Sequence, residues 1–255
     1  MNSKQLNEYF DSLLPPALSC EWDNDGAMIC TDPNKDIKKV LLTLDLTPNA
    51  FDKAVEIGAD AIITHHPLIF RPIKNLGDNS EKTKILFSLI EKGISVFSYH
   101  TRLDAARGGV NDILADIVGI KEAKPLGEGD ASMARVGEIS KTTTSELALK
   151  LKRSLNCFSV IVALSKKNDY VSKVAVLGGA ADKDFVKACI SCGVHAFIVG
   201  ELSYNAVLDA NCEGLDIILC GHYNTEFPSL AFFEKKLEEL DIESVTYDCG
   251  YFEYI

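Results

Sequence analysis

The sequence predicts an α/β fold made of two similar, duplicated units, each a largely parallel sheet flanked by helices. Three observations predict it. Short apolar runs alternate with segments of helical periodicity, an order typical of parallel sheets covered by helices. The second half of the chain repeats the order and spacing of the first. Histidines and carboxylates follow several apolar runs, at the strand ends where α/β sheets usually bind their ligands.

Three apolar runs in the first half predict buried strands, at residues 39–45, 61–64 and 94–99. Segments with apolar residues on one helical face predict helices at 3–13, 48–58, 81–92 and 110–118. Pro15 and Pro16 end the first helix. Pro48 lies in the first turn of the second helix and Gly58 at its end. Because helices separate the strands, the strands are expected to run parallel.

The second half repeats these elements. The run 173–177 resembles the run 39–43, which lies 134 residues earlier, and the run 214–219 corresponds to 93–98. The ends of the third strands share one pattern, a histidine followed four residues later by an acid: His100 with Asp104 and, after one inserted residue, His222 with Glu226. At the end of the second strand the copies differ, since Gly200 and Glu201 take the positions of His65 and His66.

The segment 124–129 has the proline and glycine content of a linker. We therefore expect a first unit at residues 1–125, which carries the His65-His66 pair, and a second at 126–255, which carries His222-x-x-x-Glu226. The C-terminal segment could pack back on the first unit.

Composition limits the function classes. The formal net charge of −11 over 255 residues argues against a broad surface for nucleic acid or anionic membrane. No apolar run reaches the roughly 18 residues of a membrane span, and the N-terminus lacks the apolar core of a signal peptide. A cytoplasmic location is therefore expected.

The eight cysteines, Cys249 among them, lie scattered among apolar neighbours, as reduced and buried thiols do. Cys189 and Cys192 form a Cys-x-x-Cys within a helical pattern. No second pair at zinc-finger spacing accompanies it, so a special role for it is disfavoured.

Four of the five histidines and two acids follow predicted strands: His65, His66, His100, Asp104, His222 and Glu226. Imidazole and carboxylate together suit zinc, manganese, iron, cobalt or nickel. Six groups exceed what one tetrahedral ion needs, so two ions that share a carboxylate are expected, in a site between the units. Each histidine–acid pair alone would be an ordinary pair on a helix face. His195, just before an apolar strand, is interpreted as structural.

Several segments resemble one family: Trp22-Asp23-Asn24, Asp45-Leu46-Thr47-Pro48, Thr64-His65-His66-Pro67-Leu68-Ile69-Phe70, His100-Thr101-Arg102-Leu103-Asp104-Ala105 with Gly108-Gly109-Val110-Asn111-Asp112, and Gly221-His222-Tyr223-Asn224-Thr225-Glu226. The sequence is similar to the Nif-three-like dinuclear-metal family, often labelled GTP cyclohydrolase I type 2 homologues. Three positions depart from its usual pattern: Asp25 instead of an apolar residue, Arg102 instead of asparagine, and Gly200-Glu201 instead of Gly-Asp. Longer members of the family carry an inserted middle domain, and this sequence of 255 residues is too short to contain one.

The resemblance implies two metal ions per chain and a ring-shaped homohexamer with the metals facing an inner cavity. The ligands it implies are His65, His66, Asp104, His222 and Glu226, the last as a bridge. His100 would lie beside the ligands and orient Asp104 or a water molecule.

The first functional hypothesis is a metal-dependent hydrolase that acts on a small substrate, with nucleotide and pterin-like compounds as candidates. His100 and Glu201 are its candidate catalytic proton carriers. No P-loop or other nucleotide fingerprint supports the cyclohydrolase label, which rests on the family name. The alternative is a non-catalytic metal-binding scaffold or regulatory protein. A nucleic-acid-binding ring is disfavoured by the acidic balance.

Overall fold

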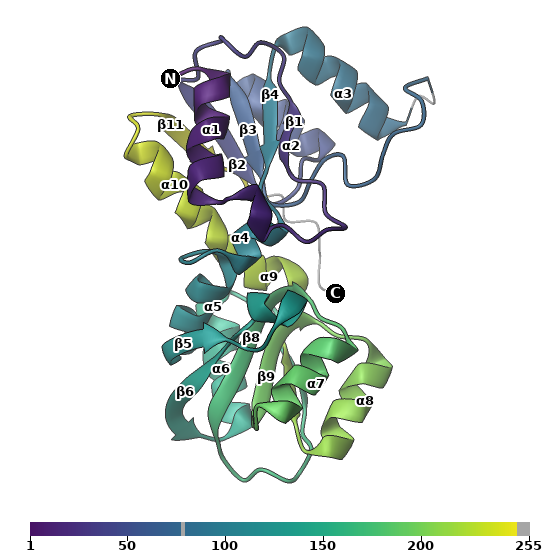
Figure 1. Cartoon of the computed structure of the whole chain (residues 1–255), viewed down its shortest axis with the longest axis vertical. Coiled ribbons are helices and arrows are strands. Elements are labelled where there is room, and N and C mark those ends of the chain that lie inside the picture. Colours follow the sequence, from purple (N-terminus) through teal and green to yellow (C-terminus); the bar gives the residue numbers. More distant parts are fainter. Residues whose placement is uncertain (78–79, 249–255) are drawn as a thin grey trace. The chain divides into compact units, whose positions relative to one another are not determined.

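A computed structural model describes residues 1–77 and 80–248 (Figure 1). The chain divides into two compact units. The first contains residues 1–103 and 230–248, and the second contains residues 104–229.

The sheet of the first unit has five strands in the order β1-β4-β3-β2-β11. Their bounds are β1 (Gly26–Ile29), β2 (Lys39–Thr43), β3 (Ala61–Thr64), β4 (Ser95–Ser98) and β11 (Glu243–Thr246). All neighbours are parallel except β1 and β4. In the central register Ala61 faces Val40 on one side and Ser95 on the other.

The helices of the first unit are α1 (Ser3–Leu13), α2 (Pro48–Glu56), α3 (Glu81–Lys92) and α10 (Leu230–Glu238), and the short α4 (Thr101–Ala105) begins here. A 3₁₀ turn, η1 (Pro16–Leu18), follows α1. Ala50 of α2 and Leu86 of α3 pack with Leu41 and Ile62 on one sheet face. Phe10 of α1 and Phe233 of α10 contact each other with ring centroids 5.5 Å apart, in a separate part of the core.

The sheet of the second unit has six strands in the order β5-β6-β8-β9-β10-β7. Their bounds are β5 (Lys121–Pro125), β6 (Arg135–Thr142), β7 (Ile161–Ala163), β8 (Val171–Ala180), β9 (Ala196–Glu201) and β10 (Asp216–Leu219). Strands β8, β9 and β10 are parallel, and the others pair antiparallel.

The helices of the second unit are α5 (Val110–Val118), α6 (Thr144–Ser154), α7 (Lys183–Ser191), α8 (Tyr204–Glu213) and α9 (His222–Glu226). Two 3₁₀ turns, η2 (Gly129–Met133) and η3 (Phe227–Ser229), complete it. Helices α7 and α8 lie side by side in front of the sheet (Figure 1). Leu114 of α5 and Leu151 of α6 pack with Val174, Val176 and Ile198 of the sheet. Val174 and Val176 alternate along β8, and Ile198 of β9 pairs with Val176, so these strand residues share one sheet face.

The predicted duplication is confirmed. The order β1-β4-β3-β2 in the first sheet matches β7-β10-β9-β8 in the second, with the same strand directions. The register matches too, since Ala196 faces Val174 and Asp216 as Ala61 faces Val40 and Ser95. The two sheets differ at one edge, where β11 extends the first and β6 with β5 extends the second.

The division of the chain falls between Leu103 and Asp104, whereas the sequence placed it at 125/126. The segment expected to be a linker overlaps β5, which pairs with β6 through Pro125 and Arg135. The C-terminal segment joins the first unit through β11, which runs parallel to β2.

Within the part of the chain that the structure describes, no helix is long and apolar enough to cross a membrane. The described cysteines are free thiols, and Cys249 lies outside the described residues. Cys189 is buried in α7, and the thiol of Cys192 lies 3.1 Å from the carbonyl oxygen of Leu126.

Candidate metal centre

Three histidines cluster at the carboxyl edge of the first sheet. His65 and His66 follow β3, and His100 follows the adjacent parallel strand β4. Their ring centroids lie 4.9 to 5.5 Å apart, and one ligand nitrogen of each lies within 4.8 Å of those of the other two. The structure therefore brings these three predicted site residues together at a spacing that suits one metal ion.

Each of the three imidazoles is held by an oxygen atom at Nδ1. The partners are the Tyr99 carbonyl for His65 at 3.0 Å, the Asp45 carboxylate for His66 at 3.0 Å, and the Asp23 carboxylate for His100 at 2.9 Å. A carbonyl or carboxylate oxygen can only accept, so in the neutral ring Nδ1 carries the proton. The lone pair is then on Nε2, which is the form that binds metals.

Asp23 holds His100 in place through several contacts that the sequence did not indicate. Its side chain is fully buried and also accepts hydrogen bonds from the backbone N–H and the hydroxyl of Thr101, at 3.1 and 2.6 Å. Burial alone would raise the pKa of Asp23, but the hydrogen bonds from His100 and Thr101 outweigh it and hold the pKa well below its usual range. Asp23 is therefore ionised, and its negatively charged carboxylate holds the His100 ring.

In the second unit, His222 lies close to two carboxylates. His222 begins α9, and its Nε2 lies 3.2 Å from Oε1 of Glu226, one turn later. The pair that the four-residue spacing predicted is thus formed. Glu201, at the end of β9, has an oxygen 3.7 Å from Nδ1 of His222. The Glu226 side chain is 4% exposed and that of Glu201 is 63% exposed, so only Glu201 opens to solvent.

Glycines make room for this arrangement. Gly179 has a φ of +69°, and a Cβ there would lie 2.2 Å from Oε1 of Glu226. A Cβ on Gly200 would lie 2.4 Å from the Gly179 carbonyl oxygen and 2.9 Å from Cα of His222. All three distances are shorter than real Cβ contacts. At Gly200 these obstructing atoms belong to the backbone, whereas at Gly179 the positive φ favours glycine and a side chain would displace the Glu226 carboxylate.

Asp104 lies in α4, partly buried, and its carbonyl oxygen accepts a hydrogen bond of 3.2 Å from the Asn111 side chain. The Asn111 oxygen in turn accepts from the N–H of Gly178 at 2.8 Å. Asn111 is fully buried and so ties α4 to the end of β8. His195 is placed elsewhere, where its Nδ1 accepts from the N–H groups of Ser172 and Lys173. This contact supports its structural interpretation.

Two departures from the family pattern form one buried ion pair. Arg102, 2% exposed, places Nε 3.0 Å from the Asp25 carboxylate, whose side chain is 5% exposed. Its Nη1 lies 2.7 Å from the carboxylate of Asp11, and its guanidinium carbon lies 4.9 Å from the ring centre of Tyr99. Arg102 thereby joins α4 to α1 and to the segment before β1.

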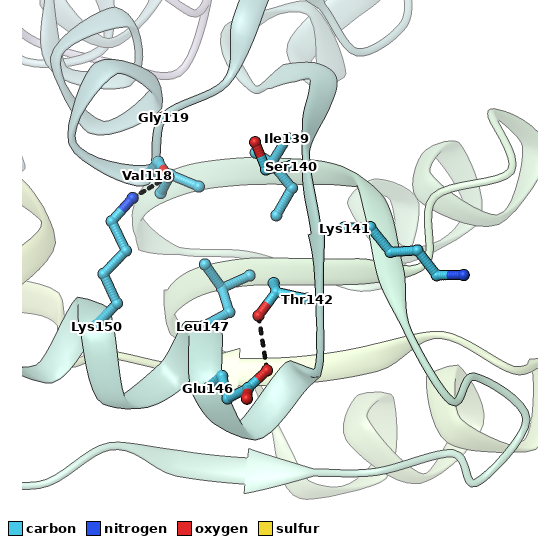
Figure 2. A pocket seen from close by; sticks show the side chains of 9 residues that line it. All are labelled: Val118, Gly119, Ile139, Ser140, Lys141, Thr142, Glu146, Leu147 and Lys150. Carbon is cyan, nitrogen blue, oxygen red and sulfur yellow. Dashed lines mark hydrogen bonds between the residues drawn. The ribbon is translucent and has the colours of Figure 1, made fainter.

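A pocket of about 240 Å³ lies elsewhere in the second unit, beside α5, β6 and α6 (Figure 2). It contains no predicted site residue. Its lining is Val118, Gly119, Ile139, Ser140, Lys141, Thr142, Glu146, Leu147 and Lys150. The Lys150 ammonium donates to the Val118 carbonyl at 2.8 Å, and the Thr142 hydroxyl donates to Glu146 at 3.0 Å. Because these polar groups already make hydrogen bonds within the protein, the pocket is a weaker candidate for a functional site than the histidine cluster.

The fold and the site define a class, namely a duplicated α/β protein with histidine and carboxylate groups able to bind metal. The family model of Duf34/NIF3 (NGG1p interacting factor 3) matches residues 1–249. The chain belongs to this family, as its motifs indicated.

The curated relatives include a GTP cyclohydrolase 1 type 2 homolog of Clostridium perfringens, 32% identical over 94% of this chain and 92% of that protein. A GTP cyclohydrolase 1 type 2 homolog of Methanocaldococcus jannaschii is 32% identical over 97% and 100% of the two chains. Among solved structures, reduced HcgD from Methanocaldococcus jannaschii is 31% identical, with a TM-score of 0.86 over 97% of this chain and 98% of that one. A Bacillus cereus protein related to NIF3, 22% identical with a TM-score of 0.88 over 100% and 99%, shares the fold.

Proposed function

We propose that the protein binds two divalent metal ions per chain and uses them to hydrolyse a small substrate. The observation that carries this proposal is the state of the three clustered imidazoles. All three have Nδ1 directed at an oxygen acceptor, which in the neutral ring puts the lone pair on Nε2, the atom that binds metals.

The proposed ligands are the five of the family resemblance: His65, His66, Asp104, His222 and Glu226. Their chemistry supports two ions that share ligands. The first unit supplies neutral nitrogens, while the second supplies the negative charge that two divalent ions require. Gly179, which leaves space for the buried carboxylate of Glu226, supports its use as a ligand.

When bound, two such ions lower the pKa of water to near neutrality and polarise a scissile ester, amide or ring C–N bond. The chain itself supplies the proton carriers. Glu201 is exposed and close to His222, so its carboxylate can take up a proton and release it to solvent. His100 is oriented by Asp23 and can accept a proton at Nε2. Five protein ligands shared by two ions would leave coordination positions for a water molecule or a substrate, as catalysis requires. The homohexameric ring and the cytoplasmic location are also part of this proposal.

The test is elemental analysis of protein purified without chelator, followed by a hydrolysis screen with nucleotides, phosphoesters and cyclic amides. We expect close to two ions per chain. His66→Ala and Glu226→Ala should each lower the metal content, whereas the control His195→Ala should not. Turnover should vanish on chelation and return with metal.

Protein that contains no metal and takes up none would overturn the proposal. Two bound ions without turnover of any compound in the screen would instead favour the non-catalytic scaffold.

A further inference from the structure

Two exposed aromatic side chains lie beside the histidine cluster of the first unit. Trp22 is 56% exposed and Phe70 is 40% exposed. The ring centroid of Trp22 lies 6.1 Å from that of Phe70 and 6.1 Å from that of His100, and the Phe70 and His100 centroids are 6.2 Å apart. The three rings therefore form a nearly equilateral group of edge-to-face contacts, with His100 on its buried side.

The segment that carries Trp22 is held on both sides of the indole. Before it, the N–H of Cys20 donates to the Thr101 hydroxyl at 3.0 Å. After it, the buried carboxylate of Asp23 holds His100 and Thr101. The side chain of Asn24 donates to the carbonyl oxygen of Ile69, next to Phe70. The indole is thus presented to solvent on an anchored segment, so binding to it loses little conformational freedom.

The Trp22 indole contributes little to folding stability, because most of its apolar surface still contacts water in the folded protein. Its position suits ligand binding instead. The indole and phenyl rings offer apolar faces, and the His100 ring contacts both of them. A flat aromatic ring is the chemical partner that such faces stack on.

We propose that Trp22 and Phe70 form a subsite that binds a planar aromatic heterocycle of the substrate, such as a nucleobase. The inference rests on the proposed hydrolytic function, since it names the substrate class of that site. A ring inserted between two others needs roughly 7 Å, twice the contact distance of carbon atoms. The Trp22 and Phe70 centroids are closer than that, so the heterocycle stacks on the outer surface of the indole.

The single tryptophan of the chain makes the test direct, because all tryptophan fluorescence reports on this subsite. Guanosine is the probe and ribose its non-aromatic control. We expect guanosine, but not ribose, to quench the fluorescence of the metal-loaded protein. In calorimetric titrations Trp22→Ala should bind guanosine about tenfold more weakly, Phe70→Ala should show a smaller loss, and Trp22→Tyr should retain binding.

Phe158→Ala is the matched control, since Phe158 is 59% exposed in the second unit. It should bind guanosine like the wild type. The metal content of every variant should equal that of the wild type.

Guanosine that fails to bind, or that binds Trp22→Ala as tightly as the wild type, would overturn the subsite even if the metal-dependent hydrolysis holds. Conversely, binding that depends on Trp22 in a protein without metal would support the subsite while the hydrolase proposal fails.

Discussion

The two units place different side chains on equivalent strand ends. After β3, the first unit has His65 and His66. At the equivalent positions of β9, the second unit has Gly200 and Glu201. The neighbouring strand ends differ as well. Asp45 of the first unit orients His66, and the equivalent residue in the second unit is a glycine.

This difference shows how one backbone can present two kinds of side chain. In the second unit, Gly179 leaves the volume that the Glu226 carboxylate fills. In the first unit, Asp45 occupies the equivalent position, and its carboxylate fixes an imidazole instead. After equivalent strands, the first unit thus carries the imidazoles of His65 and His66, and the second carries the carboxylate of Glu201. The difference depends on side-chain volume as much as on ligand chemistry.

The largest expected effect comes from adding a side chain at Gly200. Gly200→Ala should lower the free energy of unfolding by about 3 kcal/mol, because its Cβ would collide with backbone atoms that cannot move separately. Urea unfolding measures this. Gly77→Ala is the control, since its Cβ would meet no atom within 4 Å, and it should change stability by less than about 0.5 kcal/mol. Equal stabilities for the two variants would contradict the volume argument.

The next effect concerns Asp45. Asp45→Ala should weaken metal binding by about 10- to 100-fold, because His66 loses the carboxylate that fixes its ring. Stability should change little, as the Asp45 side chain is 47% exposed. Calorimetric titration with zinc or manganese measures the affinity, and Asp52→Ala, an exposed aspartate of α2, should retain it. An unchanged affinity in Asp45→Ala would show that the ring is oriented by other contacts.

The smallest effect is a pH dependence that distinguishes the two units. The lowered pKa of Asp23 means that it stabilises the fold above its unfolded pKa of roughly 3.9 and loses this contribution as pH falls toward its folded pKa. The stability difference between wild type and Asp23→Asn should therefore narrow from pH 5 to pH 3. Glu201→Gln, which changes an exposed carboxylate of the second unit, should alter stability little. Urea titrations at several pH values decide the matter, and a difference that widens toward pH 3 would be the wrong sign.

Much of the fold followed from pattern. The 134-residue repeat gave the equivalence of β2 and β8, because buried parallel strands are continuous apolar runs that periodicity detects. The strand β5, at residues 121–125, was harder to recognise from the sequence. An edge strand rich in lysine and ending in proline has the composition of a linker, since edges avoid pairing by these same residues.

Some of the side-chain proximity was predicted. His65, His66 and His100 cluster, and His222 meets Glu226, because adjacent parallel strands end at one edge and four residues make one helical turn. The anchoring acids could not be assigned this way. Asp23 lies 77 residues from His100 along the chain, and no local period connects a loop carboxylate to a distant imidazole. Family motifs contained Asp23 and Asp45 without indicating their partners.

The buried pair of Arg102 and Asp25 has a consequence for single substitutions. Arg102 also has Asp11 as a partner, so loss of the Asp25 carboxylate would leave the arginine with one anion. Loss of the arginine would instead leave the Asp25 carboxylate buried without its cation, at a cost of about 3–5 kcal/mol. The two members of the pair are therefore not equivalent, and replacement of the arginine is the more costly change.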